Sequence, residues 1–190
     1  MSMRDARLLC LAWLLAGVPA AQAQTYGLGR PATEAAIATW DIDVDAQGHG
    51  LPPGRGSVRQ GAALFAARCA ACHGPQGEGK PADRLVGGQG SLSSATPVKT
   101  IGSFWPYATT LFDFIRRAMP YNAPQSLQPD EVYALSAWLL WRNGIVPEDT
   151  VLDADSLPAV RMPNRDGFVG DPRPDVPPAR GAEKGGDVGR

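Results

Sequence analysis

Cysteine and histidine are scarce in this chain of 190 residues, which contains three cysteines and two histidines. Cys10 lies in an N-terminal stretch that we expect to be removed, so only Cys69 and Cys72 remain. A zinc site needs four ligands, and His73 directly follows Cys72, which is an awkward arrangement for one tetrahedron. A disulfide between Cys69 and Cys72 would leave the adjoining His73 unexplained. Zinc and disulfide interpretations are therefore weak.

The chain also lacks an excess of either charge, with 18 Lys and Arg against 19 Asp and Glu. Nothing in this balance suggests binding to nucleic acid or to an anionic membrane surface. The sequence shows no nucleophile–base pair, carboxylate dyad or phosphate-binding loop, so we expect no catalytic site in this chain. Its 18 prolines and 22 glycines gather outside the centre. The compact part is therefore expected to be smaller than the chain, at about 90 residues.

The long apolar run of the chain is confined to its beginning. Arg4 and Arg7 precede an apolar stretch at residues 8–18 that is too short to span a bilayer, and residues 21–23 (Ala-Gln-Ala) form a small-x-small cleavage pattern. We expect residues 1–23 to be a signal peptide, with export to the periplasm and no membrane anchor after cleavage. The alternatives are an uncleaved anchor and a lipoprotein, and the cysteine inside the run, rather than at its end, disfavours the latter.

The most informative stretch is Cys69-Ala70-Ala71-Cys72-His73. A C-x-x-C-H run is typical of c-type haem attachment. Residues three apart face the same side of a helix, so both thiols can reach the vinyl groups of one porphyrin. His73 then brings its imidazole under the iron as the proximal ligand. A thioredoxin-type C-x-x-C would follow a strand, whereas a helical pattern precedes Cys69. We predict one covalent haem c, which in bacteria is attached outside the cytoplasm.

Three helical patterns are expected to enclose this haem. The first begins at Ser57, which forms a capping box with Gln60. Gly61 inside it marks either the close approach of another helix or a tolerated surface glycine. The second covers residues 110–118, with apolar residues at helical spacing. The third covers residues 129–143 and begins with a proline, a favoured first position; its aromatic side chains could meet the first helix.

A low-spin electron-transfer haem needs a sixth ligand, and methionine opposite histidine raises the reduction potential. Met119 follows the second helix, between elements that must enclose the haem, and is the favoured ligand. An open or water-bound iron and Met162 are the alternatives, and Met119 could instead fill the core. His49, between two glycines, is expected to be a solvent-exposed loop residue rather than a ligand.

An aromatic turn precedes the second helix and contains Trp105 and Tyr107. Both side chains combine an apolar ring with a polar donor. They could therefore pack on the porphyrin while donating to a propionate, or pack in the core without such a bond.

The helix that ends in the C-x-x-C-H run, the later Met119-Pro120 and the closing helix together resemble a class I c-type cytochrome over residues 57–144. The resemblance implies a mainly α-helical domain around one covalent haem. Many members place Gly-Pro-x-Leu after the haem site, where the proline carbonyl accepts the hydrogen bond of the proximal imidazole. Here the matching residues are Ala82-Asp83-Arg84-Leu85, so the acceptor for His73 is left open.

Five segments carry a narrower resemblance: residues 40–44, 50–54, 82–88, 105–113 and 161–168. The resemblance is to SoxD, the cytochrome subunit of sulfite and sulfane dehydrogenases. It implies a periplasmic partner with a molybdenum cofactor that oxidises sulfite or protein-bound sulfane sulfur, while this chain accepts electrons and passes them to a downstream cytochrome c. Some members carry two cytochrome domains, whereas this chain has one C-x-x-C-H. The alternatives are a free periplasmic electron shuttle and a haem protein with an open iron site.

The remaining segments have no sustained periodicity. We expect an extended N-terminal arm at residues 24–56, anchored on the domain by Trp40, and a C-terminal arm at residues 145–169. The Pro- and Gly-rich residues 170–190 are expected to be disordered. The arms serve either as a docking surface for the partner or simply as cover for the domain.

Overall fold

The structure is a computed structural model that describes residues 26–170 and residue 175. The expected signal peptide, and all of the expected disordered tail except Gly170 and Asp175, lie outside these residues. The chain divides into two units between Ala38 and Thr39. In the first unit, α2 (Glu34–Ala38) is a short helix without buried residues. The sequence analysis does not predict it, because five residues are too few to show a period.

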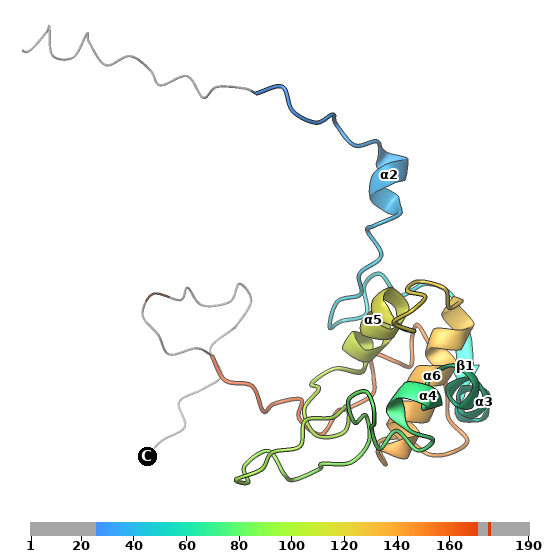
Figure 1. Cartoon of the computed structure of the whole chain (residues 1–190), viewed down its shortest axis with the longest axis vertical. Coiled ribbons are helices and arrows are strands. Elements are labelled where there is room, and N and C mark those ends of the chain that lie inside the picture. Colours follow the sequence, from blue (N-terminus) through green and yellow to red (C-terminus); the bar gives the residue numbers. More distant parts are fainter. Residues whose placement is uncertain (1–25, 171–174, 176–190) are drawn as a thin grey trace, which may run out of the picture. The chain divides into compact units, whose positions relative to one another are not determined.

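In its described part, the second unit contains four further helices: α3 (Val58–Arg68), α4 (Ala70–His73), α5 (Ala108–Ala118) and α6 (Pro129–Arg142) (Figure 1). The expected mainly α-helical architecture is confirmed. All residues from Val132 to Leu140 of α6 are buried, so this helix forms the centre of the core. Within residues 26–170 and 175, no helix has the length and apolar content needed to cross a membrane.

Helices α3 and α6 cross at a glycine. A Cβ atom built on Gly61 would lie 2.0 Å from the carbonyl oxygen of Ala134, so only a residue without a side chain fits. One turn later, the rings of Phe65 and Trp138 stack with centroids 4.0 Å apart. The capping box of Ser57 and Gln60 is formed at the start of α3. The close approach of a second helix at Gly61, and its aromatic contact with α3, are therefore confirmed.

Helix α5 begins at Ala108, two residues before the expected start. Ala108 and Thr109 are buried, so tertiary packing rather than the apolar period extends the helix. Phe112 packs on Tyr133 of α6 with ring centroids 4.5 Å apart. Phe114, one of the apolar residues at helical spacing in this stretch, is 45% exposed.

The two segments that flank the helical domain pair with each other. Strand β1 (Arg55–Ser57) lies antiparallel to β2 (Val151–Asp153), with Gly56 opposite Leu152. A Cβ atom on Gly56 would lie 2.2 Å from the backbone nitrogen of Ala134, so β1 also lies directly on α6. The N- and C-terminal flanks thus form one small sheet on the central helix.

The expectation that Trp40 anchors the N-terminal segment is wrong, since its side chain is 79% exposed. Val44 is the buried residue of this stretch. Its backbone nitrogen donates to Oδ1 of Asp113 over 2.9 Å, and Arg116 donates to the carbonyl oxygen of Ile42 over 3.0 Å. The residues on either side of Val44 are exposed, so their side chains do little to hold this segment. Hydrogen bonds between its backbone and polar side chains of α5 therefore fix it in place.

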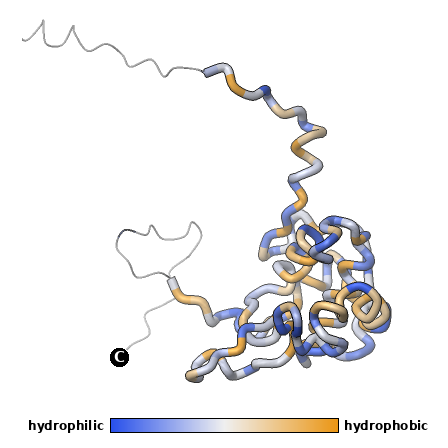
Figure 2. Tube along the Cα trace, in the orientation of Figure 1, coloured by the Kyte–Doolittle hydropathy of each residue, from blue (hydrophilic) through white to orange (hydrophobic). Residues whose placement is uncertain are grey.

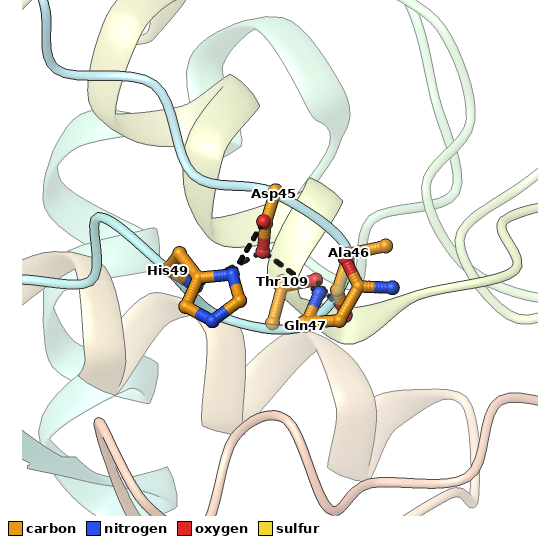
Figure 3. Close-up of polar contacts among 5 residues, drawn as sticks. All are labelled: Asp45, Ala46, Gln47, His49 and Thr109. Atoms are coloured by element: carbon orange, nitrogen blue, oxygen red, sulfur yellow. Dashed lines mark hydrogen bonds and ion pairs between the residues drawn. The ribbon is translucent and has the colours of Figure 1, made fainter. Parts of the chain in front are cut away.

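His49 lies in the loop after Val44 and is a surface residue, as expected. Its side chain is 83% exposed, and its Nδ1 lies 2.6 Å from Oδ2 of Asp45 (Figure 3). The same loop is held to α5 by Thr109, whose hydroxyl donates to the carbonyl oxygen of Ala46 over 3.2 Å. His49 thus belongs to a local loop contact.

Candidate haem site

The two cysteines lie at the junction of α3 and α4. Cys69 ends α3 and precedes α4, and the backbone nitrogens of Cys72 and His73 donate to its carbonyl oxygen over 3.1 and 3.0 Å. Both thiols are free; Cys69 is half-buried and Cys72 is exposed. Before any thioether is formed, burial raises the pKa of the Cys69 thiol to about 11. One helical turn therefore carries two thiols and an imidazole.

The imidazole of His73 is oriented by a backbone carbonyl. Its Nδ1 lies 2.8 Å from the carbonyl oxygen of Asp83. A neutral imidazole that donates from Nδ1 keeps the lone pair of Nε2 for a metal. Asp83 stands where the class I pattern has proline, so the acceptor left open by the sequence is the carbonyl of this position. The missing proline removes no hydrogen-bonding group, because a backbone carbonyl is independent of the side chain.

The loop after His73 folds back on α4 through backbone hydrogen bonds. Gly79 donates to the carbonyl oxygen of His73 over 2.7 Å, and Ala82 donates to that of Cys72 over 2.8 Å. Leu85 donates to the carbonyl oxygen of Gly77, also over 2.8 Å. These bonds close the loop, and its end supplies the Asp83 carbonyl.

The two candidate methionines lie in different environments. Met119 follows α5 in extended backbone conformation and is partly buried against the hydrophobic core. Met162 is only 1% exposed and is a member of the core. A thioether surrounded by core side chains acts as a packing residue. The structure thus leaves Met119 the more accessible of the two.

Trp105 and Tyr107 are both half-buried and have different neighbours. The ring of Trp105 meets the ring of Phe114 edge-to-face, with centroids 5.7 Å apart. The guanidinium of Arg165 lies 4.2 Å from the ring centre of Tyr107, and Arg161 forms an antiparallel β-bridge with Tyr107. The C-terminal segment thus lies on the turn that contains both aromatic residues.

Comparison with known proteins places these features in a family. The family model for cytochrome c matches residues 58–143. A chain in the crystal structure of the sulfane dehydrogenase SoxCD from Paracoccus pantotrophus is 41% identical and superposes with a TM-score of 0.73, covering 87% of this chain and 86% of that one. A comparison with curated proteins gave no match. The chain belongs to the cytochrome c family. This cytochrome is of class I, resembles SoxD, and has covalently bound haem c as its cofactor.

The residues of this cytochrome fit haem c in their chemistry. Two thiols suit thioether formation with two vinyl groups, and an imidazole whose Nδ1 already bonds to a carbonyl suits an iron ligand. Within the described residues no group of three or more His, Cys, Asp or Glu side chains could hold a separate metal ion. Two thiols and one imidazole match a metal that brings its own four nitrogen ligands.

The sequence analysis missed two contributors to the site of the cytochrome. The carbonyl of Asp83 carries no sequence signal, because every residue type offers the same group. Asn143 entered only as the last position of the third predicted helix, yet its carboxamide is buried and bonds to the loop that contains Asp83 and Leu85. Only the tertiary fold brings this helix end, 60 positions further along the chain, onto that loop.

Proposed function

We propose that this cytochrome is the electron-accepting subunit of a periplasmic, molybdenum-dependent sulfite or sulfane dehydrogenase. The observation that carries the proposal is the extent of the match to the SoxCD chain. At 41% identity it covers 87% of this chain, far more than the cytochrome c model at residues 58–143. A general cytochrome domain would share only the haem-binding part. The flanking segments are therefore shared with a chain of the sulfane dehydrogenase SoxCD.

Within this proposal, Cys69 and Cys72 would hold the haem through thioether bonds, and His73 and Met119 would bind its iron. Haem c supplies a one-electron couple between ferric and ferrous iron. The Asp83 carbonyl keeps the His73 ring in one orientation. Trp105 and Tyr107 line the pocket and limit access of water. If both residues stay bound in the ferric and ferrous states, little rearrangement of the protein would accompany electron transfer.

The proposed domain organisation follows from the same assignment. Residues 1–23 are the signal peptide that directs the chain to the periplasm, and residues 57–144 are the haem domain. Residues 24–56 and 145–169 flank it, with residues 170–190 as a disordered tail. The flanks are proposed to dock the molybdenum subunit, which carries out the oxidation. A downstream cytochrome c then takes the electrons one at a time.

Exposed apolar side chains support a docking role for the N-terminal flank. Leu28 is 87% exposed, Ile37 51% and Trp40 79%. Figure 2 shows apolar positions (orange) within the described stretch before residue 39. Apolar side chains gathered in an exposed segment are typical of a surface that a partner covers.

The proposal is tested by purifying the tagged chain from its own periplasm under gentle conditions. We expect a second protein in stoichiometric amount and molybdenum in the eluate. Haem protein that elutes alone, without molybdenum, would favour a free electron shuttle. The control is a His73→Ala variant, in which the flanking segments are unchanged. It shows whether partner binding depends on an assembled haem site.

A further inference from the structure

Asn143 forms a buried set of hydrogen bonds at the end of α6. It is 6% exposed and ends the helix directly after Arg142. Its Nδ2 donates to the carbonyl oxygen of Leu139 over 2.9 Å and to that of Leu85 over 3.2 Å. Its Oδ1 accepts from the backbone nitrogen of Gly87 over 3.0 Å. One carboxamide thus joins the most buried helix to the loop at residues 85–87.

This loop is the continuation of the segment that orients His73. Leu85 is bonded on both sides: its nitrogen donates to the carbonyl oxygen of Gly77, and its carbonyl accepts from Asn143. Asp83, two residues earlier, accepts from Nδ1 of His73. Gly87 is held further by the hydroxyl of Thr100, which donates to its carbonyl oxygen. A short, doubly tethered path therefore connects the Asn143 carboxamide to the Asp83 carbonyl.

We propose that Asn143 is a positioning residue for the proximal ligand: its carboxamide fixes the Leu85–Gly87 loop on α6 and thereby sets the hydrogen bond between Asp83 and His73. The inference rests on the proposed assignment of His73 as an iron ligand. A hydrogen bond at Nδ1 makes the imidazole a stronger electron donor, which favours ferric iron. Loosening the loop weakens that bond, so the reduction potential rises.

The test uses Asn143→Leu in the full-length holoprotein, because leucine has nearly the same shape and forms no hydrogen bonds. We expect unchanged covalent haem, a higher midpoint potential, and exchange of the His73 ring N–H with solvent about tenfold faster, as for loss of one hydrogen bond. The ring proton is observed by paramagnetic NMR of the ferric protein. Thr109→Val is the matched control, since it removes another side-chain bond to a backbone carbonyl, that of Ala46. We expect Thr109→Val to lower the free energy of unfolding without changing the midpoint potential or the exchange rate of the His73 ring proton.

A second variant moves the carboxamide without replacing it. A Cβ atom on Gly102 would lie 2.3 Å from Oδ1 of Asn143. Gly102→Ala should therefore displace the side chain of Asn143 and shift the potential in the same direction. Gly102→Ala therefore tests the role of Asn143 if Asn143→Leu is not obtained with covalent haem.

The outcomes separate this inference from the proposed function. If the ring signal of His73 is present in the parent, but neither variant changes it or the potential, Asn143 is merely structural and the inference is wrong. If the parent shows no paramagnetically shifted His73 signal, His73 is not a ligand, and the ligand assignment fails together with the inference. If Asn143→Leu and Gly102→Ala both change the His73 ring signal and the midpoint potential, while Thr109→Val changes neither, the positioning role of Asn143 is supported.

Discussion

Nδ1 of His73 lies 2.8 Å from the carbonyl oxygen of Asp83, ten residues further along the chain. The side chain of Asp83 takes no part in this hydrogen bond. We therefore predict that Asp83→Ala keeps covalent haem and the spectrum of the ferrous protein, with only the small rise in potential expected for removal of an exposed negative charge. Redox titration of the two proteins checks this. A change of axial ligation in Asp83→Ala would show that the carboxylate, not the carbonyl, orients the imidazole.

The two methionines should respond differently to replacement by alanine. Met119→Ala should retain covalent haem but lose the absorption band of the thioether–iron bond and lower the reduction potential, because a strong ligand for ferrous iron is lost. Met162 is 1% exposed in the core. Met162→Ala should leave the band unchanged and reduce the free energy of unfolding by about 2–5 kcal/mol. Reversed results from absorption spectroscopy and denaturant titration would make Met162 the ligand.

The raised pKa of the Tyr133 phenol predicts how the free energy of unfolding changes at alkaline pH. Burial, reinforced by the nearby charge of Asp153, raises the pKa of Tyr133 to about 12. The neutral phenol is therefore favoured in the folded state. Its contribution to stability is complete below a pH of about 10, the pKa of an unperturbed tyrosine, and is lost as pH rises toward 12.

Tyr133→Phe should therefore show a shallower loss of stability between these pH values than the parent. At neutral pH it should be less stable by about 1 kcal/mol, because the hydroxyl donates to the carbonyl oxygen of Pro52 over 2.9 Å. Denaturant titrations across this pH range measure both effects. Tyr121→Phe, which alters a residue that is 87% exposed, should follow the parent. If the free energy of unfolding fell equally steeply with pH in Tyr133→Phe and in the parent, the raised pKa of Tyr133 would be contradicted.

Trp40 offers a test of the docking surface that is independent of folding. Because its side chain is 79% exposed, Trp40→Ser should change the free energy of unfolding by no more than about 0.5 kcal/mol. We predict that it weakens binding to the molybdenum subunit, measured as the fraction of partner retained in co-purification. The matched control is Tyr121→Ser, at a similarly exposed aromatic residue outside the flanking segments. If both variants retain the partner equally, the flank only covers the domain.

Local signals account for the parts of the fold that the sequence predicts well. The capping box of Ser57 and Gln60 sets the start of α3 through contacts three residues apart, and Cys69 to His73 lie within one helical turn. Gly61 was recognisable because glycine is unfavourable inside a helix unless something needs the space. In each of these cases the residues that determine the local structure lie within a few positions of it in the sequence.

Long-range pairings were not predictable in the same way. Strand β1 meets β2 across nearly 100 residues, and both are too short to show a period. Trp40 was interpreted as the anchor because large aromatic side chains are usually buried, yet Val44 is buried there and Asp113 of α5 holds its backbone. Such contacts depend on which surfaces the helices present to each other, and that information is spread over the whole chain.

The most direct test of the central claim follows the haem absorbance of the purified complex after addition of sulfite or of a sulfane-carrying protein. The account predicts rapid haem reduction in the complex, and no reduction of the isolated cytochrome under the same conditions. Recombining the isolated cytochrome with the molybdenum subunit should restore the response. A complex that oxidises its substrate while the haem stays ferric, or a cytochrome that never associates with such a subunit, would contradict the account.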